Sequence, residues 1–258
     1  LGVEIFKRSH TGATPTPEGK RILDKAYELV AKYREFMDEV RSYARRNSGQ
    51  LKFSATTILF MTFLPKSLIL FKNKYPDIKV EITEESAESI LEKVRKKERD
   101  FGFVLVNDND LEKYEDEEVE YEILLRTRLI ACVGGRSPLV AKNVLTLDEL
   151  FEYPVVLYRS YEKIFAEYGA KNILFTTNNS EILKKAVVEG QAVCFLFDIM
   201  LKYDPYLASD QIVPIPLAED RQITAPLILL RSKKGYLSHA SREFIAILKE
   251  RIKSEAGG

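Results

Sequence analysis

The sequence predicts an α/β protein with two lobes, preceded by one long helix. Apolar residues recur at heptad spacing from about residue 17 to residue 46, which is typical of a long helix. After Gly49, short apolar segments alternate with helical patterns, as in parallel sheets covered by helices on both faces. Two such sets follow in about 200 residues, and a chain of 258 residues exceeds one average domain, so we expect two lobes.

A turn-rich segment precedes the long helix. Gly12, Gly19 and the Thr-Pro-Thr-Pro run 14–17 indicate that residues 7–16 form an exposed loop or a short hairpin. Pro17 suits the first helical position, because its missing N–H would have no partner there, and Thr16 is the expected N-cap. The helix is predicted to continue to about Arg46.

This helix carries a long apolar stripe. Six residues are spaced alternately four and three apart, and four more recur every seven residues beside them. Few single domains can cover a stripe of this length, so we expect the helix to pair with a second copy; the alternative is an amphipathic helix lying on its own domain. The six are Ala26, Val30, Tyr33, Met37, Val40 and Ala44, and the four are Ile22, Leu29, Phe36 and Tyr43.

The remaining elements are predicted from apolar runs and from helical spacing. Strands are expected at 51–55, 78–83, 100–106, 122–134, 153–159, 172–177, 192–197, 212–217 and 225–231. Helices are expected at 56–74, 86–97, 147–151, 180–189 and 237–253, with Ser180 as the cap of the fourth. The acidic run 108–122 is expected to be a solvated connection.

Composition narrows the function classes. Lys+Arg and Asp+Glu both number 39, although residues 1–48 hold ten basic and seven acidic side chains, a net charge of 10 − 7 = +3 that slightly favours an anionic partner. We see no apolar leader and no apolar run of about 18 residues, so we expect a cytoplasmic protein without membrane contact. Cys132 and Cys194 lie in apolar runs and are expected to be buried thiols, with a redox pair as the alternative.

The sequence offers few catalytic groups. His10 and His239 are the only histidines, and neither a nucleophile elbow, a phosphate loop nor a metal-ligand cluster occurs. We therefore expect no enzymatic activity, no cofactor and no metal.

Several segments match one family pattern in order and spacing. The first comprises Leu1, Gly2, Ile5, Phe6, Arg8, Thr16 and Gly19; the later ones are 49–53, Leu64-Pro65 with Phe71, 75–76, 99–103, 137–138 and 188–190. Together they resemble LysR-type transcriptional regulators, with the long helix similar to that family's linker helix. Ser54, Glu85 and Ala192 stand where the family usually has glycine, and Phe197 where it usually has proline. Ala192 and Phe197 are expected at the cleft side of the second lobe, so the pocket shape of relatives does not transfer there.

The resemblance implies a two-lobed effector domain of the periplasmic-binding-protein-like (type 2) fold, behind a linker helix and the remnant of a winged helix-turn-helix. Residues 1–16 would end the winged helix-turn-helix, 17–48 would form the dimerising helix, and 49–258 the effector domain. Lobe I would span about 49–127 and 235–258, and lobe II about 128–234. The helix that reads the major groove is expected upstream of Leu1.

The family also implies the partners. We expect a DNA-binding regulator that responds to a small-molecule effector bound between the lobes, forms a homodimer or homotetramer and contacts RNA polymerase. The alternative is a solute-binding protein or an enzyme on the same fold. The first would need an export signal, and the second an exposed cysteine or a placed acid/base pair.

The DNA contacts are expected in the N-terminal loop. Cations there can neutralise phosphates, and hydroxyls can add hydrogen bonds that set position without reading sequence. The alternative is a solvated loop in which Phe6 and Arg8 hold the wing to its own domain. The candidates are Lys7, Arg8, His10, Thr11, Thr14 and Thr16.

The effector contacts are expected beyond the carboxyl ends of strands, where open α/β sheets bind ligands. Hydroxyls at helix starts suit a carboxylate; the resemblance implies this role for Thr57 and Ser86, and the alternative is a helix cap alone. Arg159 can grip an acid group, whereas Asp198 favours a hydroxyl or an amine. The candidates are Thr56, Thr57, Ser86, Arg159, Ser160, Tyr161, Phe197 and Asp198.

Overall fold

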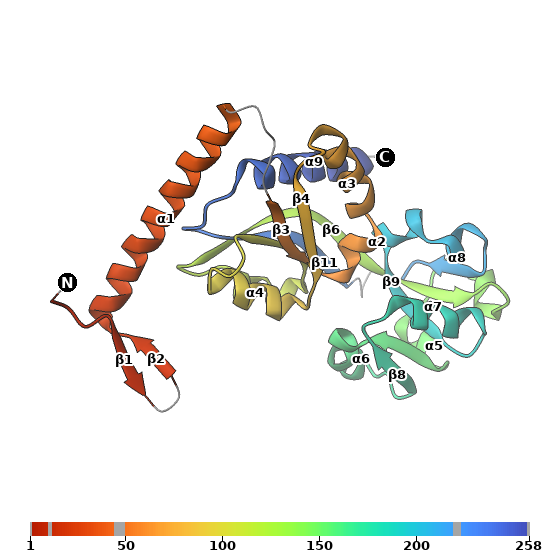
Figure 1. Cartoon of the computed structure of the whole chain (residues 1–258). Coiled ribbons are helices and arrows are strands. Elements are labelled where there is room, and N and C mark those ends of the chain that lie inside the picture. Colours follow the sequence, from red (N-terminus) through yellow and green to blue (C-terminus); the bar gives the residue numbers. More distant parts are fainter. Residues whose placement is uncertain (1, 10–11, 44–49, 219–222, 257–258) are drawn as a thin grey trace. The chain divides into compact units, whose positions relative to one another are not determined.

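The computed structural model describes residues 2–9, 12–43, 50–218 and 223–256, and the chain divides into two compact units (Figure 1). The first unit comprises Leu1–Val104, Asp110–Leu124 and Ile228–Gly258. The second comprises Leu105–Asn109 and Leu125–Leu227.

A hairpin and a long helix open the first unit. Strands β1 (Phe6–Ser9) and β2 (Gly12–Pro15) pair antiparallel, with Lys7 opposite Thr14, and α1 (Pro17–Tyr43) follows. The Gly19 N–H donates to Thr16 Oγ1 at 2.8 Å, which confirms the expected cap. A Cβ on Gly19 would lie 2.0 Å from the Ile5 carbonyl oxygen, so only glycine allows the helix to approach the preceding chain this closely.

The sheet of the first unit has the strand order β4-β3-β5-β11-β6. Strand β3 (Gln50–Ala55) pairs in parallel with β4 (Lys79–Glu84) and with β5 (Phe101–Leu105), as expected. Strands β6 (Val119–Gly134) and β11 (Thr224–Ser232) continue from this unit into the second.

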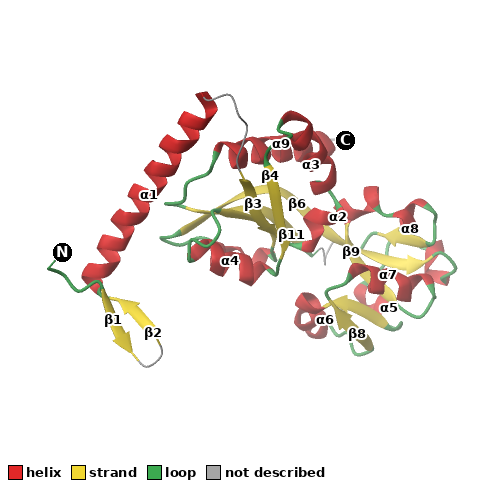
Figure 2. Ribbon diagram, viewed as in Figure 1, coloured by secondary structure: helices red, strands yellow, loops and turns green. Residues whose placement is uncertain are grey.

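Helices cover both faces of this sheet (Figure 2). Helix α4 (Ala87–Arg95) lies on one face, while α3 (Leu64–Lys74) and α9 (His239–Ala256) pack together over the other. The prediction of one helix over 56–74 is wrong, because α2 (Thr57–Met61) ends at Thr62 and α3 begins at Leu64. Pro65 explains the break, since proline suits a first turn and disfavours helical backbone at the preceding residue.

Phenylalanines fill the space between this sheet and α3 and α9. The Phe53 ring centroid lies 5.4 Å from that of Phe101, 5.4 Å from that of Phe103 and 4.9 Å from that of Phe244. Phe71 of α3 completes the cluster, with its ring centroid 5.6 Å from that of Phe244. All five rings are fully buried, so they form the main core of the first unit.

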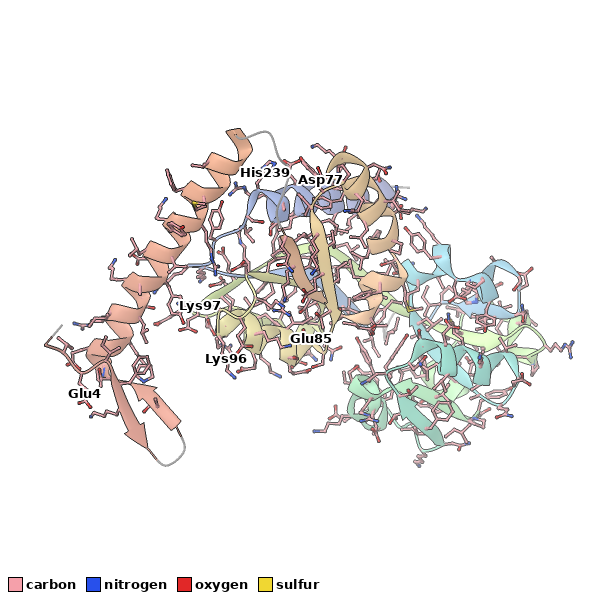
Figure 3. The ribbon with its side chains drawn as sticks, viewed as in Figure 1. Glu4, Asp77, Glu85, Lys96, Lys97 and His239 are labelled. Atoms are coloured by element: carbon pink, nitrogen blue, oxygen red, sulfur yellow. The ribbon has the colours of Figure 1, made fainter. Side chains whose placement is uncertain are left out.

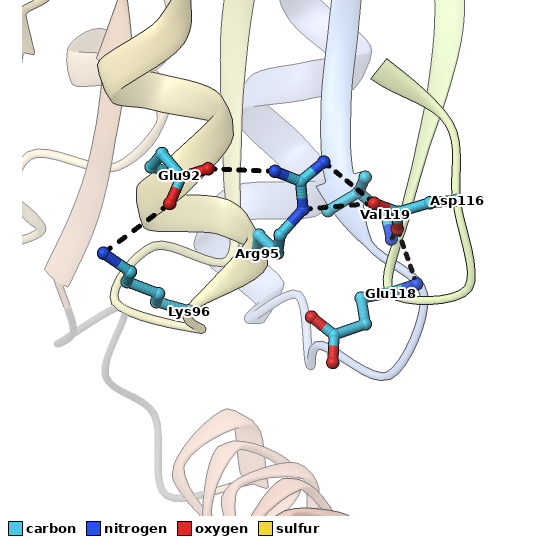
Figure 4. Close-up of polar contacts among 6 residues, drawn as sticks. All are labelled: Glu92, Arg95, Lys96, Asp116, Glu118 and Val119. Carbon is cyan, nitrogen blue, oxygen red and sulfur yellow. Dashed lines mark hydrogen bonds and ion pairs between the residues drawn. The ribbon is translucent and has the colours of Figure 1, made fainter. Parts of the chain in front are cut away.

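Arg95 links α4 to the turn that precedes β6 through an ion pair (Figure 4). Its guanidinium contacts Asp116 Oδ2 at 2.8 Å and Glu92 Oε1 at 2.9 Å. The other Asp116 oxygen accepts the backbone N–H groups of Glu118 and Val119 at 2.8 and 3.0 Å. The acidic run 108–122 is thus more ordered than the expected solvated connection, and it also contains the 3-10 helix η1 (Asp108–Tyr114).

The second unit contains a mixed sheet. Strand β7 (Val155–Tyr158) is parallel to β8 (Ile173–Thr177) and to β9 (Val193–Phe197). Strand β6, however, is antiparallel to β9 and to β10 (Ile212–Ile215). The expectation of purely parallel sheets is therefore wrong here, because a buried apolar strand shows the same residue pattern in either direction.

Short helices join these strands. Helix α7 (Ser180–Val188) is capped by Asn179, whose Oδ1 accepts the N–H groups of Glu181 and Ile182 at 3.0 and 3.4 Å. Ser180 is therefore not the cap, contrary to the prediction. Helix α5 (Leu147–Phe151) lies where it was predicted, whereas α6 (Glu162–Glu167), α8 (Pro205–Ala208) and the 3-10 helices η2 (Pro138–Ala141), η3 (Arg159–Tyr161) and η4 (Asp198–Tyr203) were not predicted.

Candidate functional site

The first polar cluster lies where β3 and β4 end and α2 begins. Thr57 Oγ1 donates to Glu84 Oε1 at 2.6 Å, and Glu84 is exposed. Thr56 is the residue before α2, and its N–H donates to the Phe103 carbonyl at 3.0 Å. Glu84 was not among the predicted site residues, and its carboxylate accepts the hydroxyl proton of the predicted Thr57.

Glu85, the next residue, follows the end of β4 (Figure 3) and has three polar partners. Its carboxylate accepts hydrogen bonds from the hydroxyls of Ser54 and Ser89, each at 2.7 Å, and lies 2.5 Å from Lys93 Nζ. Burial alone would raise the pKa of Glu85, but these hydrogen bonds and the Lys93 charge lower it to about 2. Glu85 and Lys93 therefore form a neutralised pair, and Glu85 is a positioning group for the start of α4.

Ser86 caps α4, as the sequence predicts. Its Oγ accepts the Ser89 N–H at 3.2 Å, and Ser86 is exposed. Ser86 therefore has a structural task, and an effector contact by its hydroxyl stays a prediction.

Asp198 forms the corresponding polar cluster of the second unit, just after β9. Its carboxylate accepts the hydroxyl of the buried Thr127 and lies 3.2 Å from Arg128 Nε. Arg128 keeps about half of its side chain exposed, at 52%. Asp198, a predicted site residue, is thus joined by two neighbours on β6 that sequence reasoning did not single out.

A second aspartate of this unit is held in the same way. Asp108 accepts hydrogen bonds from Arg126 and from the Thr224 hydroxyl. Burial acts to raise the pKa of Asp108, but the hydrogen bonds from Thr224 and Arg126 outweigh it and lower the pKa. Arg126 and Arg128 are two residues apart on β6, and residues at this spacing in a strand lie on the same face.

The remaining predicted effector residues fall into two groups. Tyr161 and Phe197 are buried, and their ring centroids lie 5.8 Å apart in an edge-to-face arrangement. Arg159 and Ser160, in η3, are exposed. The structure thus brings Tyr161 together with Phe197 as packing residues.

The predicted DNA contacts divide similarly. Lys7 and Thr14 are exposed on the hairpin and directly opposite each other, and Arg8 lies next to Lys7 in β1. Thr16 is buried, and its hydroxyl donates to the Glu4 carbonyl at 2.7 Å while it caps α1, so we leave it out of the DNA-contact set. His10 and Thr11 lie outside the described residues.

One side of α1 carries large exposed apolar side chains. Leu29 is 72% exposed, Tyr33 62% and Phe36 60%, far above what a core-facing residue shows. Val30 and Val40 of the predicted seam are also exposed. Within the described chain, no helix is long and apolar enough to cross a membrane, and no group of three or more His, Cys, Asp or Glu side chains is arranged to hold a metal ion.

Comparison with known proteins identifies related sequences. A sequence model of the LysR substrate binding domain matches residues 44–253. The chain is 27% identical over 256 residues to the uncharacterized HTH-type transcriptional regulator YbhD of Escherichia coli, a match covering 96% of this chain and 78% of that protein. It is 29% identical over 203 residues to the HTH-type transcriptional regulator CysB of Haemophilus influenzae, covering 75% of this chain and 61% of that protein.

The fold is also found in solved structures. Full-length CbnR, solved with its target DNA, shares 18% sequence identity with a TM-score of 0.61, and the match covers 97% of this chain and 85% of that one. At this level of identity the likeness shows the fold alone.

Proposed function

The chain belongs to the LysR-type transcriptional regulators, and on that premise we propose that it acts by binding DNA and a small-molecule effector in the cytoplasm. The extent of the family match, residues 44–253, and the names of its relatives support this role. We propose regulation and not catalysis, with RNA polymerase as a further partner on the strength of the family alone.

The contact between Thr57 and Glu84 carries our proposal for the effector. Because Thr57 donates its only hydroxyl proton to Glu84, this cluster presents hydrogen-bond acceptors: the remaining lone pairs of Thr57 and an exposed carboxylate. A partner for such a cluster is an amine or a hydroxyl. We therefore place the donor group of the effector at Thr57 and Glu84, where the sequence alone favoured a carboxylate.

Within the second unit, Arg128 is proposed as a separate contact for an acid group. Arg128 uses Nε toward Asp198 and has further N–H groups on a half-exposed guanidinium, which suits a carboxylate. Asp198 holds that guanidinium in place. Arg159 and Ser160 stay candidate contacts, as does Ser86 in the first unit.

Ligand binding to the intact chain tests this site. We would measure thermal shifts with amino acids and with the matched acids that lack the amine, which should bind more weakly. Thr57→Val and Glu84→Gln should each weaken amino-acid binding by about 1–3 kcal/mol, because the bound amine loses one of its hydrogen-bond acceptors. Glu88→Gln, which removes an exposed carboxylate of α4, is the matched control. Equal affinity in all variants would contradict the assignment.

The hairpin is proposed to contact DNA phosphates through Lys7, Arg8 and Thr14. Replacing Lys7 by Gln should weaken binding to any duplex to a similar extent, because phosphate contacts carry no sequence information. The slope of log K against log salt should fall by about 0.9 in magnitude for one lost phosphate contact. An unchanged slope would show that Lys7 does not face the DNA.

Helix α1 is proposed to pair with α1 of a second copy, giving a homodimer or homotetramer. The exposed stripe containing Leu29, Tyr33 and Phe36 supports this, since an isolated helix would leave it in water. Val30→Lys with Val40→Lys should reduce the mass in sedimentation. Lys25→Ala, a change at an exposed side chain that pairs with Glu28 along the helix, is the control.

A further inference from the structure

The two cysteines of the chain lie directly opposite each other. Cys132 is on β6 and Cys194 on β9, and the antiparallel register of these strands pairs the two residues. Side chains of directly paired residues point to the same face of a sheet. Both thiols therefore stand on one face, in adjacent strands of the second unit.

This pairing satisfies the geometry of a disulfide. Directly opposite residues of an antiparallel ladder have Cα atoms about 4.5 or 5.5 Å apart, depending on the hydrogen-bonding position. Disulfides span Cα separations of roughly 4.4–6.8 Å, so either value lies in the range. The usual Cα spacing of such a pair is therefore compatible with a disulfide.

The neighbouring Cys132 thiol and burial both raise the pKa of the Cys194 thiol. Both residues are fully buried, at 0% exposure. Oxidation is therefore slow in the closed fold and needs a small oxidant or a local opening of the strands, because the thiol and not the thiolate is the stable form.

We propose that Cys132 and Cys194 are a modification site at which a hydroperoxide forms an intramolecular disulfide between β6 and β9. One thiol first loses its proton, and the thiolate attacks one oxygen of hydrogen peroxide. The O–O bond breaks, a sulfenic acid forms, and the hydroxide that leaves takes up that proton as one water. The second thiol then displaces the sulfenic oxygen as a second water and closes the S–S bond. Two electrons leave the two sulfurs and reduce the peroxide, so the step balances with hydrogen peroxide alone.

The disulfide would act on the part of the second unit that carries Asp198. Strand β9 ends one residue before Asp198, and β6 supplies Thr127 and Arg128, which bind that carboxylate. A covalent link between the two strands fixes their register close to this cluster. The formation of the bond itself does not depend on the proposed effector site.

The test is oxidation of the intact folded chain with hydrogen peroxide, followed by unfolding in acid, alkylation with N-ethylmaleimide and mass measurement. We expect a product about 2 Da lighter that takes up no label, and a linked peptide pair containing both cysteines. The bond closes a loop spanning 194 − 132 = 62 residues, so the thermal midpoint of the second unit should rise by roughly 5–10 °C and return on reduction.

Cys132→Ser and Cys194→Ser are matched controls. Each keeps one thiol and should show neither the linked peptides nor the rise in midpoint, which separates the disulfide from peroxide damage at the three methionines. The proposal is overturned if both thiols of the oxidised wild type still take up the label. It is equally overturned if both reach sulfinic acid without a linked peptide.

Discussion

In the first unit the core is a cluster of phenylalanines around Phe53, whereas the second unit buries a charged pair between helix α7 and the residue that caps α8. Lys184 Nζ lies 2.6 Å from Asp204 Oδ2, with side-chain exposures of 1% and 3%. Lys184 also contacts Glu181 and stands 5.3 Å from the centre of the Tyr206 ring. Burial acts to lower the pKa of Lys184, but the hydrogen bonds to Asp204 and Glu181 raise it.

The difference shows that two similar α/β units can be stabilised by different interactions, apolar burial in one and a buried ion pair in the other. A phenylalanine cluster gains free energy from apolar area removed from water, and each ring contributes separately. A buried ion pair gains little over apolar residues of the same shape, but removing one partner leaves an uncompensated charge. The first core should thus weaken in steps, and the second should fail when either member of the pair is lost.

The largest effect is expected from Asp204→Ala. Losing one partner of the buried pair should cost roughly 3–5 kcal/mol. A further loss of about 1 kcal/mol is expected because Asp204 also caps α8 by accepting the Tyr206 N–H. Urea unfolding followed by far-ultraviolet circular dichroism measures this loss in the free energy of unfolding. Asp77→Ala, a change at an exposed aspartate, is the control. A loss below 1 kcal/mol would show that the pair is not buried.

Phe53→Ala should be almost as costly. Removing the central ring leaves a cavity and costs roughly 3–5 kcal/mol. This cost should not change between pH 5 and pH 8, because no charge is involved. The same unfolding assay at pH 5 and pH 8 checks both points, and Leu70→Ala, at a side chain 49% exposed, is the control.

Glu85 should give a smaller, pH-dependent effect. Burial opposes its charge, but its partners lower the pKa to about 2 from the ordinary 4.5. Since the unfolded chain binds the proton more readily, the stabilisation is fully present above about pH 4.5 and is lost as pH falls toward 2. Allowing for solvent screening, we expect on the order of 1–2 kcal/mol. Acid titration of unfolding in Glu85→Gln should lack this component, while Glu88→Gln should retain it.

The smallest effect is expected at the surface contact of Arg95. Arg95→Gln removes ion pairs to Glu92 and Asp116 whose side chains are 52% and 38% exposed. Such pairs contribute about 0.2–1 kcal/mol, and salt screens them. The difference from wild type should therefore shrink between low and high salt. A salt-independent loss above 2 kcal/mol would mean that Arg95 packs as a core residue.

Much of the fold could be predicted, because burial leaves a pattern in the sequence. The run 192–197 predicts β9, and 147–151 matches α5 residue for residue. Strand direction could not be predicted, since β6 reads as a buried strand whichever way it runs. The cap of α7 was misassigned because Asn179 and Ser180 are both good caps, and only the backbone decides between them.

The candidate site was less predictable than the fold. Thr57, Ser86 and Asp198 were found because they follow or begin recognisable elements. Asp108 gave no signal, because it stands in an acidic run and its partner Thr224 is 116 residues away. Hydrogen bonds between such distant residues depend on how the strands are brought together, which residue types alone do not reveal.

The division of the chain has a consequence for proteolysis. The backbone passes between the two units four times, at 104–105, 109–110, 124–125 and 227–228. A protease that cuts at one of these points leaves the units covalently tethered through the others. Two cuts, one within 105–109 and one within 125–227, also leave fragments that remain associated, because β6 and β11 each run through both units. Limited digestion should therefore yield nicked chains that migrate together until they are denatured, and a gene fragment encoding one unit needs joins that the natural chain does not have.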